Sequence, residues 1–174
     1  REAFAGLGDV ALVPDREISR AHLRDADALV VRSKTLVGPE LLDGTPVGFV
    51  ATATAGADHF DVSWLNRAGV AWTASPGCNA NSVAEYVATA LVLLARKRAA
   101  LLPGRTLGIV GVGQVGSRVA HKAGLLGLRV RRNDPPLALK TGSADFLPLD
   151  AVLAEADALT LHVPLASDGP FPTR

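Results

Sequence analysis

A glycine-rich turn is the stretch of this 174-residue sequence whose residue types and spacing point most directly to chemistry. Residues 106–117 read TLGIVGVGQVGS, an apolar run followed by the spacing GxGxxG. In a strand–turn–helix unit with this spacing, the first glycine, Gly111, permits a tight turn. Gly113 lets backbone amides approach a pyrophosphate, and Gly116 lets the helix pack on the strand. A plain strand-to-helix turn can share the spacing, so the flanking sequence must decide.

The flanking residues favour a dinucleotide site. Ile109 and Val110 give β-branched strand residues before the glycines, and a helical apolar periodicity follows them. The next apolar run ends in Asp134, at about the 20-residue offset expected of the carboxylate that accepts a ribose 2′-hydroxyl. We therefore predict an NAD site in which Gln114 and Val115 contact phosphate through their backbone amides.

Two arginines leave the choice between NAD and NADP open. Arg131 and Arg132 occupy a predicted strand where a parallel sheet usually has apolar residues on both faces. A cationic pair beside the ribose could tolerate the extra phosphate of NADP. Equally, both arginines could extend their aliphatic stems over apolar surface and reach water. The carboxylate of Asp134 favours NAD, because it would repel that phosphate.

Polar residues also follow the predicted strands of the first half of the chain, where ligands bind in open α/β sheets. Arg32 and Ser33 follow one strand and suit a phosphate or a carboxylate. Thr54 lies in a loop of small residues that a ligand could approach closely. As alternatives to ligand binding, Arg32 could simply be exposed to solvent. The hydroxyls of Ser33 and Thr54 could hydrogen-bond to nearby backbone. The four histidines are scattered without metal-ligand spacing, and each is interpreted as packed or hydrogen-bonded.

The periodicities predict an α/β fold in which strands and helices alternate. Asp61 is expected to cap a helix over 62–68 that ends at Gly69. A capping box at Ser82 is expected to open a long helix that is apolar nearly all round and buried between layers. We expect a loop after Pro135 and Pro136. The other predicted elements are helices over 1–7, 18–24, 39–42 and 149–154 and strands over 10–13, 28–31, 49–52, 70–73, 128–134 and 158–161.

The composition indicates a globular protein, with 48% hydrophobic and 20% charged residues. The formal net charge is +1, so neither nucleic acid nor an anionic membrane is an expected partner. A single cysteine fits a reducing compartment, and no apolar run reaches membrane length, so we expect a cytoplasmic protein. The chain opens without methionine and stops after a strand and loop, which suggests part of a longer protein. Pro103 and Gly104 favour a boundary between a first domain, 1–98, and a second, 99–174.

Several segments together resemble the D-2-hydroxyacid dehydrogenases, and among them those that oxidise 4-phosphoerythronate in pyridoxal phosphate biosynthesis. Besides the glycine-rich unit, the segments are VRS (31–33), ATATAGADH (51–59), PGCNA (76–80), VAEY (83–86) and DPP (134–136). The resemblance implies a flavodoxin-like substrate domain followed by part of a Rossmann doubly wound domain. It also implies NAD as cofactor, a small phosphorylated 2-hydroxy acid as substrate, and a homodimer.

The resemblance also implies roles for particular residues. Ser33 and Thr54 would bind substrate, with Arg32 beside them as a phosphate contact. Val163 stands where the family often has threonine, so a contact there with the nicotinamide side would use the backbone. The family's catalytic histidine, acid and arginine are expected beyond Arg174, so no catalytic residue is assigned here. Another dehydrogenase of the family, or a non-catalytic NAD-sensing protein of the same fold, remains an alternative.

Overall fold

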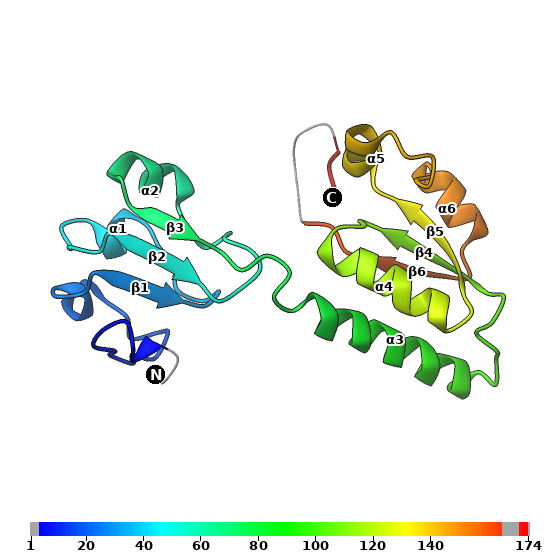
Figure 1. Ribbon diagram of the computed structural model, residues 1–174, viewed down its shortest axis with the longest axis horizontal. Coiled ribbons are helices and arrows are strands. Elements are labelled where there is room, and N and C mark those ends of the chain that lie inside the picture. Colours follow the sequence, from blue (N-terminus) through cyan, green and yellow to red (C-terminus); the bar gives the residue numbers. More distant parts are fainter. Residues whose placement is uncertain (1–3, 165–170, 174) are drawn as a thin grey trace. The chain divides into compact units, whose positions relative to one another are not determined.

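The chain forms two compact units, Arg1–Cys78 and Asn79–Arg174. The computed structural model shown in Figure 1 describes residues 4–164 and 171–173. Each unit has its own three-stranded sheet, and every strand pair in both sheets is parallel. The predicted α/β fold class is therefore confirmed.

The sheet of the first unit has the strand order β1–β2–β3. These strands are β1 (Ala28–Val31), β2 (Phe49–Thr52) and β3 (Ala71–Thr73). Because all three are parallel, their carboxyl ends lie at one edge of the sheet. A short 3-10 helix, η2 (Arg20–Leu23), precedes β1. The helix α1 (Pro39–Leu42) connects β1 to β2, and the helix α2 (Val62–Ala68) connects β2 to β3.

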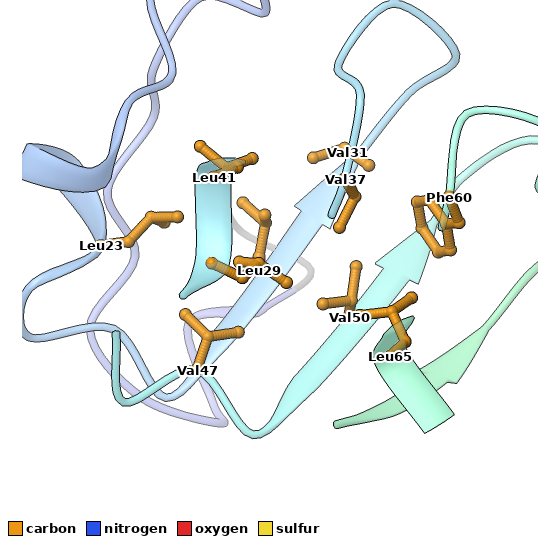
Figure 2. Packing of buried hydrophobic residues seen from close by; sticks show 10 residues of the cluster. Leu23, Leu29, Val31, Val37, Leu41, Val47, Val50, Phe60 and Leu65 are labelled. Atoms are coloured by element: carbon orange, nitrogen blue, oxygen red, sulfur yellow. The ribbon is translucent and has the colours of Figure 1, made fainter. Parts of the chain in front are cut away.

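Local signals set the ends of α2. The Asp61 side chain accepts a hydrogen bond of 2.9 Å from the backbone N–H of Trp64, as an N-cap does. After the helix, Gly69 takes a left-handed conformation with φ of 71°. Both predictions for this helix are confirmed. Leu65 then lies fully buried against β2, where it packs with Val50 in the core (Figure 2).

The sheet of the second unit places β4 (Thr106–Val110) between β5 (Arg129–Asn133) and β6 (Ala158–Leu161). A single parallel bridge from Arg132 to Phe146 extends the sheet beyond β5. The chain thus moves to one side of β4 and then crosses to the other side for β6. This reversal is the topological switch point of a doubly wound sheet, where ligands bind beyond the carboxyl ends of the strands.

Helices cover both faces of this second sheet. Gly116, in α4 (Gln114–Leu125), lies against Ile109, whereas Val152, in α6 (Leu149–Glu155), lies against Gly108. Because successive strand residues point to opposite faces, α4 and α6 cover opposite sides of β4. The long helix α3 (Ala80–Lys97) packs alongside α4, as Figure 1 shows.

The long helix differs from its prediction in its start and in its burial. It begins at Ala80 with Asn79 as N-cap, so the capping box predicted at Ser82 is wrong. The side chain of Asn81 donates to Glu85 Oε1 at 2.8 Å. In a capping box, the Glu85 carboxylate would instead accept from the backbone N–H of Ser82. Burial all round is also not found. Only the side that meets α4 is covered in the described structure, and the buried residues of α3 are Ala80 and Ala84.

The packing of α3 also bears on the domain boundary. The compact units divide between Cys78 and Asn79, whereas the sequence placed the boundary at 98–99, after this helix. The Pro103–Gly104 break marks a turn within the second unit, since Gly104 N donates to the carbonyl of Gly127 at 2.8 Å. A turn rich in proline and glycine therefore does not have to be a domain linker.

Three predictions near the N-terminus were wrong or only partly met. No strand forms over residues 10–13, and Leu12 is 72% exposed. A short apolar run carries no period that would fix its structure, and here it gains no sheet partner. The helix expected over 18–24 is reduced to η2. Of the helix expected over 1–7, residues 1–3 lie outside the described residues, and the rest forms a turn.

The loop expected after Pro135 and Pro136 is instead the helix α5 (Pro135–Thr141). Proline is compatible with the first helical positions because the N–H groups there have no partner within the helix. Asp134 caps this helix by accepting from the N–H of Leu137 at 3.0 Å. Gly142, with φ of 65°, ends it. The strand and helix predicted at 158–161 and near 149–154 are confirmed as β6 and α6.

Candidate functional site

The turn between β4 and α4 is built by close approaches between backbones. Gly111 has φ of 84°, in the left-handed region that favours glycine. A Cβ at this position would lie 2.5 Å from the carbonyl oxygen of His162, beyond the end of β6. A Cβ on Gly116 would overlap the carbonyl oxygen of Gly111. Side chains at these two glycines would therefore force the strand, the turn and the helix apart.

The N-terminus of α4 follows directly from this turn. Gly113 is its N-cap and brings no side chain to accept from the first-turn amides. The backbone N–H groups of Gln114 and Val115 belong to that first turn, and the helix dipole adds a partial positive charge there. The Gln114 side chain is turned along the helix, where its Oε1 accepts from Arg118 at 2.8 Å. The backbone of this turn is thus suited to an anion.

Asp134 links the end of β5 to the glycine-rich turn. Its Oδ2 accepts from Val112 N at 2.7 Å, and its Oδ1 accepts from Leu137 N at 3.0 Å. A carboxylate oxygen has two lone-pair directions, so each oxygen can still accept one further hydrogen bond from a ligand hydroxyl. The carboxylate therefore positions two backbone segments and remains able to bind a ribose.

Val163 lies at the same edge of the second sheet. A Cβ on Gly111 would come within 2.7 Å of Val163 Cγ1, so the segment after β6 lies directly on the turn. His162 N donates to the carbonyl of Val110 at 2.8 Å, which holds β6 beside β4 up to this point. The structure thus brings together, beyond the carboxyl ends of β4, β5 and β6, all the predicted cofactor residues: Gly111, Gly113, Gln114, Val115, Gly116, Asp134 and Val163.

The two arginines of β5 have different surroundings. Arg131 Nε donates to Glu155 Oε2 at 2.6 Å, which pairs this arginine with α6. The Nε of Arg132 is buried and has no hydrogen-bond partner among the described residues. Arg131 and Arg132 are successive strand residues and so point to opposite faces of the sheet. The two side chains therefore do not lie together beside the ribose, as the cationic pair considered from the sequence would require.

A separate cavity lies in the first unit, at the carboxyl ends of β1 and β2. Its volume is about 380 Å³. Ser33 lies just after β1 and Thr54 just after β2, so the structure places these two predicted residues in one cavity. Arg32 is exposed and does not line it. The lining residues are Ser33, Leu36, Thr54, Gly56, Asp58 and His59.

A chain of hydrogen bonds runs along the wall of this cavity. Thr54 Oγ1 donates to the carbonyl of Gly56 at 3.1 Å and lies 2.7 Å from Thr52 Oγ1. Thr52 Oγ1 in turn lies 3.1 Å from His59 Nε2. Burial lowers the pKa of His59 and outweighs the opposing charge of Asp58, which favours the neutral ring. Sequence reasoning did not single out Thr52 or Asp58, although both lie in or beside the segment ATATAGADH.

Other candidate chemistry is absent from the described part of the chain. Residues 4–164 and 171–173 contain no group of histidine, cysteine or carboxylate side chains that could hold a metal ion. A second cavity, of about 260 Å³, lies between α3 and α4 and contains none of the predicted site residues. The glycine-rich turn and the cavity of the first unit are therefore the two candidate sites.

Comparison with known proteins places this arrangement in a family. The family described as D-isomer specific 2-hydroxyacid dehydrogenase, catalytic domain, matches residues 7–166. The chain belongs to this family. The erythronate-4-phosphate dehydrogenase of Salmonella paratyphi B is 51% identical over 173 residues, which cover 99% of this chain and 46% of that protein. The chain thus spans about half the length of the curated relatives it matches.

Solved structures show the same fold. One is the NAD⁺-bound 3-phosphoglycerate dehydrogenase of Entamoeba histolytica, with a TM-score of 0.72 and 26% identity, over 88% of this chain and 52% of that one. Another is the D-lactate dehydrogenase of Aquifex aeolicus in complex with NAD and lactic acid. Its TM-score is 0.68 at 27% identity, over 86% of this chain and 51% of that one. These dehydrogenases contain Rossmann-type NAD-binding domains.

Two glycines of α4 provide a matched test of the close approach. We expect Gly116→Ala to lower the free energy of unfolding by about 2 kcal/mol or more, because its methyl group would overlap the Gly111 carbonyl. Gly124→Ala meets open space in the same helix and should raise the free energy by about 0.5–1 kcal/mol. Urea denaturation measures both. Equal effects of the two substitutions would contradict the packing described here.

The buried histidine predicts a pH effect on stability. Because the pKa of His59 is lowered in the folded state, the unfolded chain binds a proton there more readily as the pH falls below 6.5. The free energy of unfolding should therefore decrease from about pH 7 to about pH 5, and less steeply in His59→Gln. Urea denaturation at both pH values provides the measurement, with the exposed His22→Gln as control. An identical slope in His59→Gln and wild type would show that His59 does not contribute.

Proposed function

We propose that the complete gene product carrying this chain oxidises 4-phospho-D-erythronate to the corresponding 2-oxo acid in pyridoxal phosphate biosynthesis, with NAD as hydride acceptor. The observation that carries the proposal is the 51% identity, over 99% of this chain, to erythronate-4-phosphate dehydrogenase. The chain's own geometry supports it, because each unit has a candidate site at the carboxyl ends of its parallel strands.

The cavity of the first unit is the proposed substrate site. Ser33 makes no hydrogen bond within the described residues, so its hydroxyl is free to donate to an anionic oxygen of the substrate. Thr54 lies on the same wall. Arg32 follows β1 and is exposed, and we propose that its guanidinium contributes to binding of the phosphate. A small phosphorylated 2-hydroxy acid has the two anionic groups that these residues suit.

The glycine-rich turn of the second unit is the proposed NAD site. The amides of Gln114 and Val115 would hold the pyrophosphate at the start of α4, where Gly113 and Gly116 leave the backbone accessible. Asp134 would accept the ribose hydroxyls, and the backbone at Val163 would contact the nicotinamide side. Bound NAD would accept the hydride from the substrate carbon that carries the 2-hydroxyl.

The reaction also needs a general base and a cation, for which we propose no residue of this chain. A general base must remove the proton of the 2-hydroxyl, and a cation must bind the carboxylate. The family resemblance assigns these roles to a histidine supported by an acid and to an arginine, all beyond Arg174. The proposed role of this chain is therefore to bind and orient the two reactants, and we assign no catalytic residue within it.

The organisation of the whole protein is also a proposal. We assign substrate binding to the first unit and cofactor binding to the second, with the family resemblance implying a homodimer.

Among the described helices none has the length and apolarity to cross a bilayer. Cys78 is a free, exposed cysteine, which fits a reducing compartment and supports a cytoplasmic location. The net charge of +1 gives no reason to expect nucleic acid as a partner.

The activity is tested with the complete gene product, by following NADH formation with 4-phosphoerythronate. Ser33→Ala should lower kcat/KM for this substrate about tenfold or more, because a hydrogen bond to a charged group is lost. It should lower kcat/KM for unphosphorylated erythronate much less. Ser63→Ala, at an exposed serine of the same unit, is the matched control. Equal losses for both acids would contradict the phosphate role of Ser33, and turnover of other 2-hydroxy acids alone would indicate a different dehydrogenase of the family.

The cofactor choice is tested at Asp134. Wild-type protein should bind NAD more tightly than NADP, because the carboxylate repels a 2′-phosphate. In Asp134→Asn the single amide oxygen can accept from only one of the amides of Val112 and Leu137, so both cofactors should bind more weakly. The negative charge is also gone, so the preference for NAD over NADP should fall about tenfold or more. Fluorescence titration with both cofactors measures the ratio of dissociation constants. Tighter binding of NADP by the wild type would contradict the assignment.

A further inference from the structure

The cavity between α3 and α4 has a lining that the proposed function does not use. Its volume is about 260 Å³, and it lies wholly within the second unit. Every lining side chain is polar, two carry a positive charge, and none is acidic. The lining residues are Asn81, from the first turn of α3, and Ser117, Arg118, His121 and Lys122, from α4. Such a lining suits a small anion.

The two positive charges lie on the same face of α4. Arg118 and Lys122 are four residues apart, so their side chains are neighbours on the helix surface. Like charges at this spacing destabilise a helix. The sequence of α4, QVGSRVAHKAGL, contains neither Asp nor Glu, so no acid of the helix itself offsets the repulsion. An anion bound between the two side chains would offset it.

Several N–H groups at the cavity are available to a ligand. Arg118 donates through Nη1, to the carbonyl of Gln114 at 2.6 Å and to Gln114 Oε1 at 2.8 Å. These contacts hold the side chain along α4 and leave its Nε and Nη2 without a partner among the described residues. The ring of His121 also makes no hydrogen bond in that part of the chain. Ser117 is different, because its hydroxyl donates to the carbonyl of Gly113 at 2.7 Å.

Glu85, on α3, competes with an anion for the donors of this cavity. Its Oε1 lies 3.5 Å from Lys122 Nζ and accepts from Asn81 Nδ2 at 2.8 Å. Both partners keep further N–H groups, because an ammonium has three and an amide has two. The Glu85 side chain is 59% exposed, so water screens its pairing with Lys122. Glu85 therefore offsets the charge of Lys122 in part, whereas Arg118 has no carboxylate within 4.0 Å among the described residues.

We infer that this cavity binds a small phosphate anion, either free phosphate or the phosphate group of a metabolite. The planar guanidinium of Arg118 can donate two parallel hydrogen bonds to phosphate oxygens, and Lys122 adds a point charge. Asn81 and His121 can donate from the cavity wall. The volume lies below the range of about 300–1,000 Å³ that is typical of pockets for drug-sized ligands, which fits a small ligand.

This site is additional to the two sites of the proposed function. None of its lining residues belongs to the predicted cofactor residues or to the cavity of the first unit. The inference therefore does not rest on the proposed function, and its test measures binding without turnover.

The binding test follows the ring signals of His121 by nitrogen-15 NMR while inorganic phosphate is titrated into the complete gene product. The pH and, with chloride, the ionic strength are held constant, and His121→Gln assigns the signal. We expect a saturable shift with phosphate and none with chloride alone. Glycerol 3-phosphate is the second probe: tighter binding than that of phosphate supports a metabolite ester as the ligand, and weaker binding supports free phosphate. No saturable shift with either probe overturns the inference.

Substitutions distinguish this cavity from other phosphate-binding groups of the protein. Arg118→Gln and Lys122→Gln should each weaken phosphate binding about fivefold or more, because each removes a charged donor. Glu85→Gln should strengthen binding about threefold, because it removes the competing carboxylate. Lys140→Gln, at an exposed lysine of α5 outside the cavity, is the matched control and should leave binding unchanged.

The opposite signs of these effects make the test sharp. A loss of helix packing could weaken binding in the arginine and lysine variants, but it would not strengthen binding in Glu85→Gln. Equal dissociation constants in wild type, Arg118→Gln and Glu85→Gln would overturn the inference, whether or not the protein oxidises 4-phosphoerythronate.

Discussion

The close approach of three backbone segments around Gly111 is the constraint on which the second unit depends. The carbonyl of Gly111 lies where a side chain on Gly116 would be, and the backbone after β6 lies where a side chain on Gly111 would be. These contacts bring the start of α4 against the ends of β4 and β6 without any intervening side chain. Amides at the helix start are then left at the switch point of the sheet, where an anionic cofactor group can reach them.

Asp134 shows how one residue can serve the fold and the site together. Its two oxygens accept from amides on either side, one in the glycine-rich turn and one in the first turn of α5. The carboxylate is therefore held in place by the fold itself, which would lower the entropic cost of binding a ligand hydroxyl there. In the first unit, the bond from Ser75 to the Thr52 carbonyl similarly ties together the ends of β2 and β3 beside the cavity.

The incorrect predictions have physical reasons. The start of α5 was missed because two prolines were interpreted as a turn, although a helix tolerates proline at its first positions when a residue such as Asp134 caps it. The burial of α3 was overestimated because its apolar residues were taken to require cover on every side. The described structure covers the face toward α4 and leaves Leu93 and Leu94 more than half exposed. The isolated apolar run near Leu12 had no period that could distinguish a strand from a loop.

The sequence by itself determined the features whose causes are local: the α/β alternation, the glycine-rich turn, the cap and stop of α2, and the placement of polar residues after strands. Gly116 meets the carbonyl of Gly111 and Asp61 caps the amide of Trp64, so both act within a few residues and their spacing was sufficient. The tertiary structure alone decided that Ser33 and Thr54 share a cavity and that α3 packs on α4. It also brought His59, Thr52 and Thr54 into one chain of hydrogen bonds, since side-chain types do not specify which groups meet after folding.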